Sequence, residues 1–301
     1  MTGFICFDKP ENITSFSAVG ILKRLTHEKK AGHTGTLDPM ATGVLPVAFG
    51  GATRFIELFD THDKAYEARI KLGMTTDTLD ITGKVLTECE SNITEDELIK
   101  VLNDFKGKIK QLPPMYSAIK KDGVRLYELA RKGIEIEREE REVVIYSIEC
   151  LSFDEKAQEF KISVECSAGT YIRSLSSDIG EKLGCGAVMT ALRRTKALGF
   201  TENDCVTEEQ IKKLAADGRL EEAIISVEDV LKYESVTVSE KQAVRFHNGG
   251  FLTTDRITKK LISSAYYKVY SPLGEFLGVG EVSPDGEQLN VKRVYMGDST
   301  K

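Results

Sequence analysis

The sequence predicts a chain of mixed α and β structure, in the α/β class, with a small β-rich domain at its C-terminal end. Between Lys64 and Gly73, and again between Glu159 and Cys166, apolar and polar residues alternate, as in strands with one buried face. Ser15 can cap a helix, and after it apolar residues recur at helical spacing. Near the C-terminal end, three short strand patterns are separated by two turn sequences, which indicates consecutive hairpins.

The other elements follow from capping signals, chain breakers and short apolar runs. Further strands are expected at Gly3–Phe7, Val44–Phe49, Val143–Phe153, Ala187–Thr195, Ala265–Tyr270, Phe276–Val282 and Gln288–Tyr295. Further helices are expected at Thr53–Asp60, from Thr94 to about Phe105, at Arg125–Lys132, from Tyr171 to Leu183, and after the capping residues Thr207 and Ser239. In the first helix, Phe16 shares its spacing with Val19, Leu22 and Leu25. We place a domain boundary near Ile225 to Tyr233, which divides the chain into residues 1–228 and 229–301.

Composition narrows the class of protein. The chain has 301 residues, of which 41% are hydrophobic and 29% charged, as in ordinary globular proteins. Apolar runs stay below the ~18 residues that a membrane-spanning helix needs, and the first ten residues lack the pattern of a signal peptide. We therefore expect a cytoplasmic protein that does not enter membranes. The six cysteines include no C-x-x-C pair, so we expect reduced thiols and no zinc site.

Charge is unevenly distributed along the chain. The net charge of −6 argues mildly against a nucleic-acid-binding protein. However, eight basic and two acidic residues lie between Lys106 and Gly133, whereas ten acidic and four basic residues lie between Thr201 and Glu234. A polyanion would be attracted to the first segment and repelled by the second. A basic run is as often a plain solvated surface, so charge alone leaves RNA contact open.

The most informative stretch is G-H-T-G-T-L-D-P-M-A-T-G-V-L-P, residues 32–46. Three glycines permit backbone angles closed to other residues: Gly32, Gly35 and Gly43. Pro39 fixes its own φ angle and restrains Asp38. A stiff loop with one acid suits a carboxylate that must meet one atom of a substrate. Since Asp-Pro alone is usually a turn or a helix cap, the local pattern indicates no more than a ligand-facing acidic loop.

Three further segments carry side chains that could take part in chemistry. Tyr66 lies on a predicted strand, Tyr171 and Arg173 lie in the first turn of a predicted helix, and Leu192 lies in an extended stretch. Each has an ordinary structural explanation as a core aromatic residue, a helix-end or surface residue, or a core leucine. Residue patterns alone do not bring these segments together in space.

The stretch around Asp38 resembles the catalytic motif of the TruB-type tRNA pseudouridine synthases, a long and specific pattern. The resemblance covers most of the chain. Its other motifs are Asp8-Lys9-Pro10 with Thr14-Ser15, Lys64-Ala65-Tyr66, Thr76-Asp77-Thr78 with Asp80 and Gly83, Gly169 to Leu175, and Leu192-Arg193-Arg194. Two positions depart from the family pattern, Asn12 for a glycine and Gly51 for a frequent acid. Because Asn tolerates left-handed backbone, we expect the turn at Asn12 to survive.

The resemblance implies a fold and partners. The fold is a mixed, mostly antiparallel central sheet with flanking helices and the site in a central cleft. Residues 1–228 would form the catalytic domain, with a basic RNA-binding insertion at 105–142, and residues 229–301 a small β-rich, PUA-like RNA-binding domain. The expected partner is the T arm of tRNA, bound by a monomer without a guide RNA. Neither a metal ion nor another cofactor is expected.

The resemblance also implies roles for the catalytic residues. Asp38 would attack the target uridine, position 55 of tRNA, at either the base or the sugar carbon. Arg173 would pair with Asp38 and lower the pKa of the carboxyl by about 1–3 units. Tyr66 would stack on the uracil after it flips out of the RNA and could take part in proton transfer.

The remaining contacts to RNA would come from residues around this centre. Tyr171 and Leu192 would line the uracil pocket, and His33 could fill the space that the flipped base leaves. Lys120, Lys121 and Arg125 would contact phosphates of the T arm.

Three other functions are alternatives to a guide-independent synthase. Guide-dependent relatives share these motifs but carry longer basic tails. A non-catalytic tRNA-binding or tRNA-folding protein could keep the same scaffold. A hydrolase or phosphotransferase with an Asp nucleophile is disfavoured, because the chain has neither a P-loop nor a D-x-D pair at a strand end.

Overall fold

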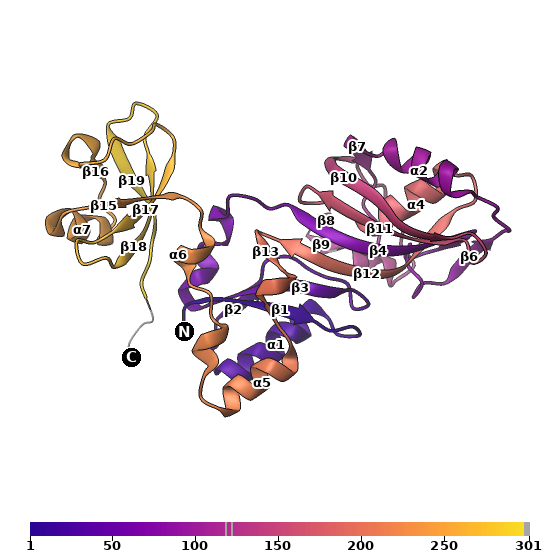
Figure 1. The fold of residues 1–301 in the computed structure, drawn as a ribbon, viewed down its shortest axis with the longest axis horizontal. Coiled ribbons are helices and arrows are strands. Elements are labelled where there is room, and N and C mark those ends of the chain that lie inside the picture. The colour runs from indigo at the N-terminus through magenta and orange to yellow at the C-terminus, as the bar shows by residue number, and fades with distance from the viewer. Residues whose placement is uncertain (118, 122, 298–301) are drawn as a thin grey trace.

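A ten-stranded sheet and a five-stranded sheet dominate the computed structural model, which describes residues 1–117, 119–121 and 123–297, with only the backbone at 120 and 121 (Figure 1). The larger sheet contains β1 (Gly3–Lys9), β2 (Ala31–His33), β3 (Thr42–Phe49), β4 (Lys64–Leu72), β7 (Gly107–Gln111), β10 (Arg141–Asp154), β11 (Glu159–Cys166), β12 (Ala187–Ala197), β13 (Phe200–Thr201) and β14 (Cys205–Val206). The smaller contains β15 (Glu234–Thr237), β16 (Leu252–Thr253), β17 (Tyr266–Tyr270), β18 (Phe276–Val282) and β19 (Gln288–Val294).

Two short hairpins and the helices complete the fold. The hairpins pair β5 (Met74–Thr76) with β6 (Val85–Glu88) and β8 (Lys120–Lys121) with β9 (Val124–Arg125). The α-helices are α1 (Ser15–Thr26), α2 (Glu95–Asn103), α3 (Leu126–Ala130), α4 (Ile172–Lys182), α5 (Glu208–Ala216), α6 (Val227–Val230) and α7 (Glu240–His247). The 3₁₀ turns are η1 (Gly50–Arg54), η2 (Ile56–Leu58), η3 (Glu202–Asp204), η4 (Leu220–Ala223) and η5 (Thr254–Arg256).

The larger sheet is mixed and mostly antiparallel, which confirms the expected fold class. Its main order is β14-β1-β3-β12-β4-β11-β10-β7, and only the β1–β14 and β3–β12 neighbours along this path run parallel. Helices α1 and α5 lie beside the β1–β3 end, and α2 and α4 lie near β10 and β11 at the other (Figure 1). Strand β12 pairs with both β3 and β4, so residues from these three strands meet in the middle of the sheet.

The alternating pattern of β4 correctly predicts its buried face. Tyr66, Ala68, Ile70 and Leu72 are buried in the main core, together with apolar residues of β11 and β12. Strand β4 lies between β11 and β12, so its ladder is hydrogen-bonded on both sides. This position gives Tyr66 a fixed backbone next to β12.

The expected helix at Thr53–Asp60 is wrong. The chain forms the 3₁₀ turns η1 and η2 there. Phe55, Leu58 and Phe59 are all buried in one cluster that includes Val279 of β18. Their spacing of i, i+3 and i+4 also fits one face of an α-helix, so the apolar pattern correctly predicts which side chains are buried but does not separate an α-helix from short 3₁₀ turns.

Two other boundaries differ from expectation for identifiable reasons. Strand β1 does not end at Phe7, because its pairing with β3 continues to Lys9, opposite Gly43. The N-cap of α1 is Thr14, whose side chain accepts a hydrogen bond from the Ser17 amide, and not Ser15. Ser15 is the first helical residue, and its hydroxyl is used elsewhere.

The smaller sheet contains the three expected C-terminal strands, and β15 and β16 add to it. It contacts the rest of the chain through aromatic rings, with Phe55 lying 6.3 Å from Phe276 and 6.2 Å from Tyr295 between ring centroids. The ion pair between Arg293 and Glu57 joins the same surfaces. The division at residue 228 remains a prediction. Within the described residues, no helix combines the length and the apolar character needed to span a membrane.

Candidate active site

The loop that carries Asp38 lies between β2 and β3 and is tied to the end of β1. The buried Lys9 ammonium donates to the carbonyl oxygens of Pro10, Ile13 and Pro39, at 2.8, 2.8 and 3.2 Å. Burial lowers the pKa of Lys9 to about 8, although the Asp38 charge opposes the shift. The three carbonyl contacts hold the loop firmly, and the cation also adds positive potential near Asp38.

The start of α1 provides a second anchor for this loop. The Ser15 hydroxyl donates to the Leu37 carbonyl at 3.0 Å and accepts from the Leu37 amide at 2.8 Å. The Asn12 amide donates to the Pro39 carbonyl at 2.8 Å. Asn12 has φ 64°, so it adopts the left-handed conformation as expected. Both residues that flank Asp38 are therefore hydrogen-bonded to residues 9–15.

Among the three glycines of the loop, Gly43 is the one that the backbone requires. It has φ 99°, and a Cβ atom there would lie 2.2 Å from the Arg194 carbonyl oxygen of the neighbouring strand. Gly32 and Gly35 do not have positive φ, and an added Cβ would meet nothing within 4 Å at Gly32 and ordinary contacts at Gly35. Of the three glycines, Gly43 is therefore the one that uses the backbone freedom that glycine permits.

Asp38 and Arg173 form a bidentate ion pair. Arg173 Nε lies 2.9 Å from Asp38 Oδ2, and Arg173 Nη2 donates to Oδ1 at 3.2 Å. The Arg173 side chain is 6% exposed, whereas a third of the Asp38 side chain is exposed. The contact implied by the resemblance is present, and the carboxylate remains open to solvent and to a substrate.

Three further acceptors hold the Arg173 guanidinium. Asp80 Oδ2 lies 3.7 Å from Nη1, the Thr78 carbonyl accepts from Nη1 at 3.2 Å, and the Tyr116 carbonyl accepts from Nη2 at 2.8 Å. Asp80 is itself fixed by Thr78 and Thr82. The motif that contains Asp80 does not by itself predict a role for this residue. A contact made by a backbone carbonyl, such as that of Tyr116, leaves no signal in the pattern of side chains. Both contacts emerge only from the structure.

The pKa of Asp38 is raised, not lowered. Burial is the largest cause and Asp80 adds to it, while Arg173 and Lys9 pull the pKa down. The expected effect of Arg173 is present, but the loss of solvation outweighs it. Asp38 is therefore a carboxylate whose charge depends on its cationic neighbours.

Tyr66 lies in the sheet directly opposite Arg194, a residue that is almost fully buried. Arg194 donates from Nε to the Val44 carbonyl at 2.7 Å and from Nη2 to the Gly35 carbonyl at 3.2 Å. Burial raises the pKa of Tyr66 to about 12 in spite of this neighbouring cation, so its hydroxyl stays protonated at neutral pH. Leu192 is two residues away on β12, opposite Ala68, and is 8% exposed.

Tyr171 connects α4 to the last residue of β7. Its backbone amide donates a hydrogen bond to Gln111 Oε1 at 3.0 Å, and its backbone carbonyl accepts one from Gln111 Nε2 at 3.2 Å. Tyr171 is the N-cap of α4, two residues before Arg173, and it is half-buried. Burial also raises the pKa of its hydroxyl.

His33 is half-buried at the end of β2. Burial and the Arg194 charge lower its pKa, which keeps the imidazole neutral at pH 7. Its Nδ1 atom is buried without a hydrogen-bond partner among the described residues.

The basic insertion is more evenly charged than its sequence suggests. Carboxylates at its C-terminal end pair with its lysines: Lys108 Nζ lies 2.9 Å from Glu142 and Lys110 Nζ lies 3.9 Å from Glu140. Arg125 is exposed and donates to the Tyr127 hydroxyl at 2.9 Å. The side chains of Lys120 and Lys121 lie outside the described residues, so their predicted phosphate contacts stay a prediction.

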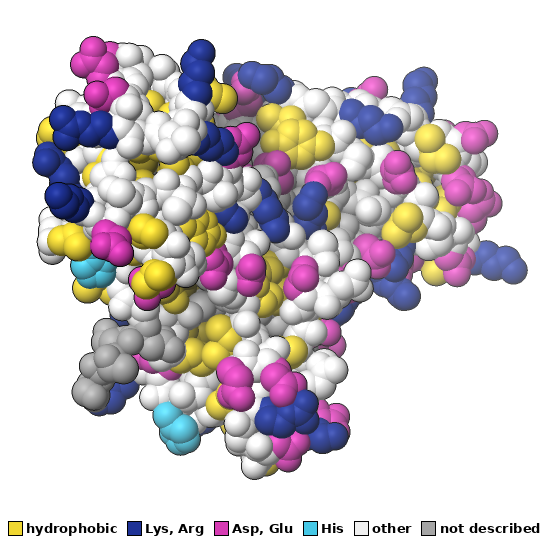
Figure 2. All heavy atoms as spheres, turned by 60° about the vertical axis from the view of Figure 1, so that its left-hand side comes forward, with side chains coloured by type: hydrophobic (Ala, Val, Ile, Leu, Met, Phe, Trp, Pro, Cys, Tyr) yellow, Lys and Arg dark blue, Asp and Glu magenta, His cyan; other side chains and the backbone are white. Residues whose placement is uncertain are grey.

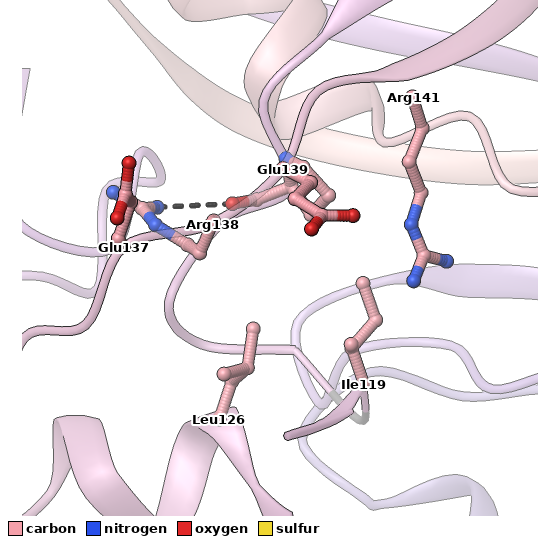
Figure 3. Close-up of a pocket in the computed structure, with 7 residues that line it drawn as sticks. Ile119, Leu126, Glu137, Arg138, Glu139 and Arg141 are labelled. Atoms are coloured by element: carbon pink, nitrogen blue, oxygen red, sulfur yellow. Dashed lines mark hydrogen bonds between the residues drawn. The ribbon is translucent and has the colours of Figure 1, made fainter. Parts of the chain in front are cut away.

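A pocket of about 180 Å³ lies within the insertion and not at Asp38 (Figure 3). It is lined by Pro113, Ile119, Leu126, Glu137, Arg138, Glu139 and Arg141. Arg138 donates to the Pro113 carbonyl at 2.9 Å, and Arg141 lies on the opposite side of the opening (Figure 3). This pocket shares no lining residue with the Asp38 centre.

The acidic segment lies away from the sheet centre. Figure 2 shows carboxylates mixed with basic side chains over the lower lobe, where α5 lies in Figure 1. Within the described residues, no three His, Cys, Asp or Glu side chains are placed to bind a metal ion together.

Comparison with known proteins shows the family. The model for the TruB family pseudouridylate synthase N-terminal domain matches residues 23–172, and that for the tRNA pseudouridylate synthase B C-terminal domain matches residues 173–232. A relative from Clostridium tetani named tRNA pseudouridine synthase B is 46% identical over 291 residues, covering 96% of this chain and 98% of the relative. A relative of the same name from Pseudomonas fluorescens is 42% identical over 290 residues, covering 95% and 93%.

Solved structures show the same fold over nearly the whole chain. A Cbf5-Nop10-Gar1 complex contains a chain with 28% identity and a TM-score of 0.73, covering 98% of this chain and 85% of that one. An H/ACA ribonucleoprotein bound to a substrate RNA containing 2′-deoxyuridine contains one with 26% identity and a TM-score of 0.73, covering 99% and 86%. The chain therefore belongs to the TruB family of pseudouridylate synthases.

Proposed function

We propose that the protein converts the uridine at position 55, in the T-arm loop of tRNA, to pseudouridine, with Asp38 as the nucleophile and without a guide RNA. The observation that carries this proposal is the bidentate ion pair between the partly exposed Asp38 and the buried Arg173. It combines a solvent-accessible carboxylate with a fixed cation. The relatives named tRNA pseudouridine synthase B support tRNA as the substrate class.

The reaction exchanges one bond of the target nucleotide for another. Asp38 attacks the base or the sugar carbon, the bond between uracil N1 and C1′ breaks, and the uracil turns. A bond between C5 and C1′ then forms, the bond between Asp38 and the substrate breaks so that the carboxylate is regenerated, C5 loses a proton and N1 gains one. The site has to keep Asp38 ionised, hold the free uracil, and shield both from competing water.

The neighbouring residues are suited to these tasks. Tyr66 would stack on the uracil, and its pKa of about 12 keeps a proton available on the hydroxyl. Leu192 and Tyr171 would line the pocket, and the neutral His33 would occupy the space left by the flipped base. Lys9 and Arg173 both favour the ionised form of Asp38.

The proposal extends to the parts of the chain that would hold the RNA. Residues 105–142, with Arg125 and the neighbouring Lys120 and Lys121, would contact phosphates of the T arm. Residues 229–301 would act as a PUA-like RNA-binding domain. The active form would be a monomer, which a sedimentation measurement with and without tRNA would check.

The test uses the purified protein alone with two unmodified tRNA transcripts, one of them carrying cytidine at position 55. We expect pseudouridine at position 55 of the first transcript and at no position of the second. Modification only after a guide RNA and partner proteins are added would contradict the proposal. Tight tRNA binding without any modification would favour the non-catalytic alternative.

A further inference from the structure

Phe16 is an exposed aromatic residue that the fold does not use. Its side chain is 83% exposed, and the next most exposed aromatic residue in the described part of the chain, Tyr146, is 51% exposed. The helical spacing of α1 groups Phe16 with Val19 and Leu22, yet those two are buried and Phe16 is not. Packing therefore does not explain a large apolar ring at this position.

The position of Phe16 is fixed relative to the nucleophile. It follows Ser15, whose hydroxyl holds both the amide and the carbonyl of Leu37, the residue before Asp38. Thr14 caps the same turn by accepting from the Ser17 amide at 2.9 Å. The first turn of α1 and the Asp38 loop are thus hydrogen-bonded to one another, and the exposed Phe16 directly follows the residue that makes this connection.

The surroundings of the ring favour a single flat ligand. Asn12, Thr14 and Ser17, which flank Phe16 in sequence, are polar and exposed, and the Thr14 and Ser17 hydroxyls bond to one another. A docked protein surface would need an apolar area larger than one isolated ring. A nucleobase needs only one aromatic face, and unpaired bases of RNA loops are commonly held in this way.

We propose that Phe16 stacks on an unpaired base of the RNA substrate that lies next to the target uridine. This inference rests on the proposed function, since it requires RNA at the Asp38 site. Phe16 would hold the neighbouring base outside the loop while the target base enters the pocket. Its contribution would be to RNA binding and not to the bond changes.

The chain contains no tryptophan, so the inference has a direct spectroscopic test. In an Asp38→Asn background, Phe16→Trp introduces one fluorophore at the proposed contact. Titration with a T-arm hairpin RNA should quench its emission, because stacking on a base quenches indole. The matched control is Leu86→Trp in the same background, because Leu86 is 61% exposed and lies on β6, at the far end of the sheet from α1 (Figure 1).

Affinity provides the second readout. Phe16→Ala should weaken binding of the hairpin by about 5- to 150-fold, the usual range for the loss of one stacked base. Phe16→Tyr should bind like the parent, and so should the control Leu86→Ala. In turnover assays, Phe16→Ala should raise KM and leave kcat at saturating RNA within a factor of about two of the parent, because stacking that acts in binding alone is lost equally from ground and transition states.

The outcomes separate this inference from the proposed function. Parental affinity of Phe16→Ala, with no change in the emission of Phe16→Trp, would overturn the inference while the parent still modifies tRNA. If the parent neither binds nor modifies tRNA, the proposed function fails and the inference fails with it. Weaker binding by Phe16→Ala together with quenching at residue 16 but not at residue 86 would support it.

Discussion

The charged residues of the sheet centre and those of the insertion are held in opposite ways. At the centre, Arg173 is 6% exposed and is held by two carboxylates and two carbonyl oxygens. In the insertion, Lys108 and Lys110 are 73% and 77% exposed and each has one carboxylate partner. Buried charges interact strongly and keep one geometry, whereas exposed pairs are weak and easily exchanged for phosphates.

Residue type alone therefore does not show whether a basic side chain acts in catalysis or in RNA binding. An arginine with several buried partners sets the charge and orientation of a neighbouring carboxylate. A lysine on the surface supplies attraction that salt can screen. Substitutions at the centre should therefore change kcat and its pH dependence, and substitutions in the insertion should change affinity and its salt dependence.

Arg173→Met should have the largest effect among the residues that support Asp38. We expect kcat to fall by about 10²–10³-fold, because a charge-assisted contact to the reacting carboxylate is lost. Arg173 lowers the pKa of Asp38, so its removal raises that pKa further and fewer molecules carry the ionised form at acidic pH. The acid limb of the pH–rate profile should therefore move to higher pH.

Arg193→Met is the matched control. Arg193 is on β12 and pairs with Asp8 and Glu202, not with Asp38. Its removal should leave the acid limb in place. An equal shift of the limb in both variants would mean that the Asp38–Arg173 contact does not set the titration.

Asp80→Asn should have a smaller effect and the opposite sign on the pH profile. It loosens one side of Arg173, for which we expect a loss of about 10- to 100-fold in kcat. Asp80 raises the pKa of Asp38, so removing its charge should move the acid limb to lower pH. Single-turnover rates of parent and variant, measured as a function of pH, give both the loss in rate and the shift of the acid limb. A shift of the limb to higher pH would show that Asp80 does not raise the pKa of Asp38.

Local signals in the sequence predicted much of the fold, because they depend on residues close together in the chain. The capping boxes at Thr94 and Thr207 and the alternation in β4 are examples. The contacts that position the Arg173 guanidinium could not be predicted from local patterns. Asp80 reaches it from a distant loop, and Tyr116 contributes only a backbone oxygen. The raised pKa of Asp38 also depends on burial, which no local pattern measures.

Changing Lys120, Lys121 and Arg125 together to Ala should affect binding alone. We expect about tenfold weaker tRNA affinity at 100 mM salt and a shallower dependence of log K on log salt, with the slope reduced by about 2–3 for three lost phosphate contacts. The control triple variant replaces Lys212, Lys213 and Arg219, which lie on or next to the acidic lobe. Equal affinities for the two triple variants would show that the insertion is a plain solvated surface.

The smallest effect is expected at Gly32. Gly32→Ala meets open space at a backbone angle that alanine accepts, so the free energy of unfolding should stay the same or rise by up to ~1 kcal/mol. Gly43→Ala should lower it by more than about 1 kcal/mol, because it combines left-handed strain with a clash against the Arg194 carbonyl. Chemical denaturation measures both, and equal stabilities would contradict the special backbone of Gly43.

The most direct test of the whole account is single-turnover modification of tRNA by Asp38→Asn at saturating protein, measured beside its tRNA affinity. We expect Asp38→Asn to bind tRNA with parental affinity and to react at least about 10⁴-fold more slowly than the parent, since the nucleophile is gone while the binding surface remains. Formation of pseudouridine by Asp38→Asn at the parental rate would contradict it.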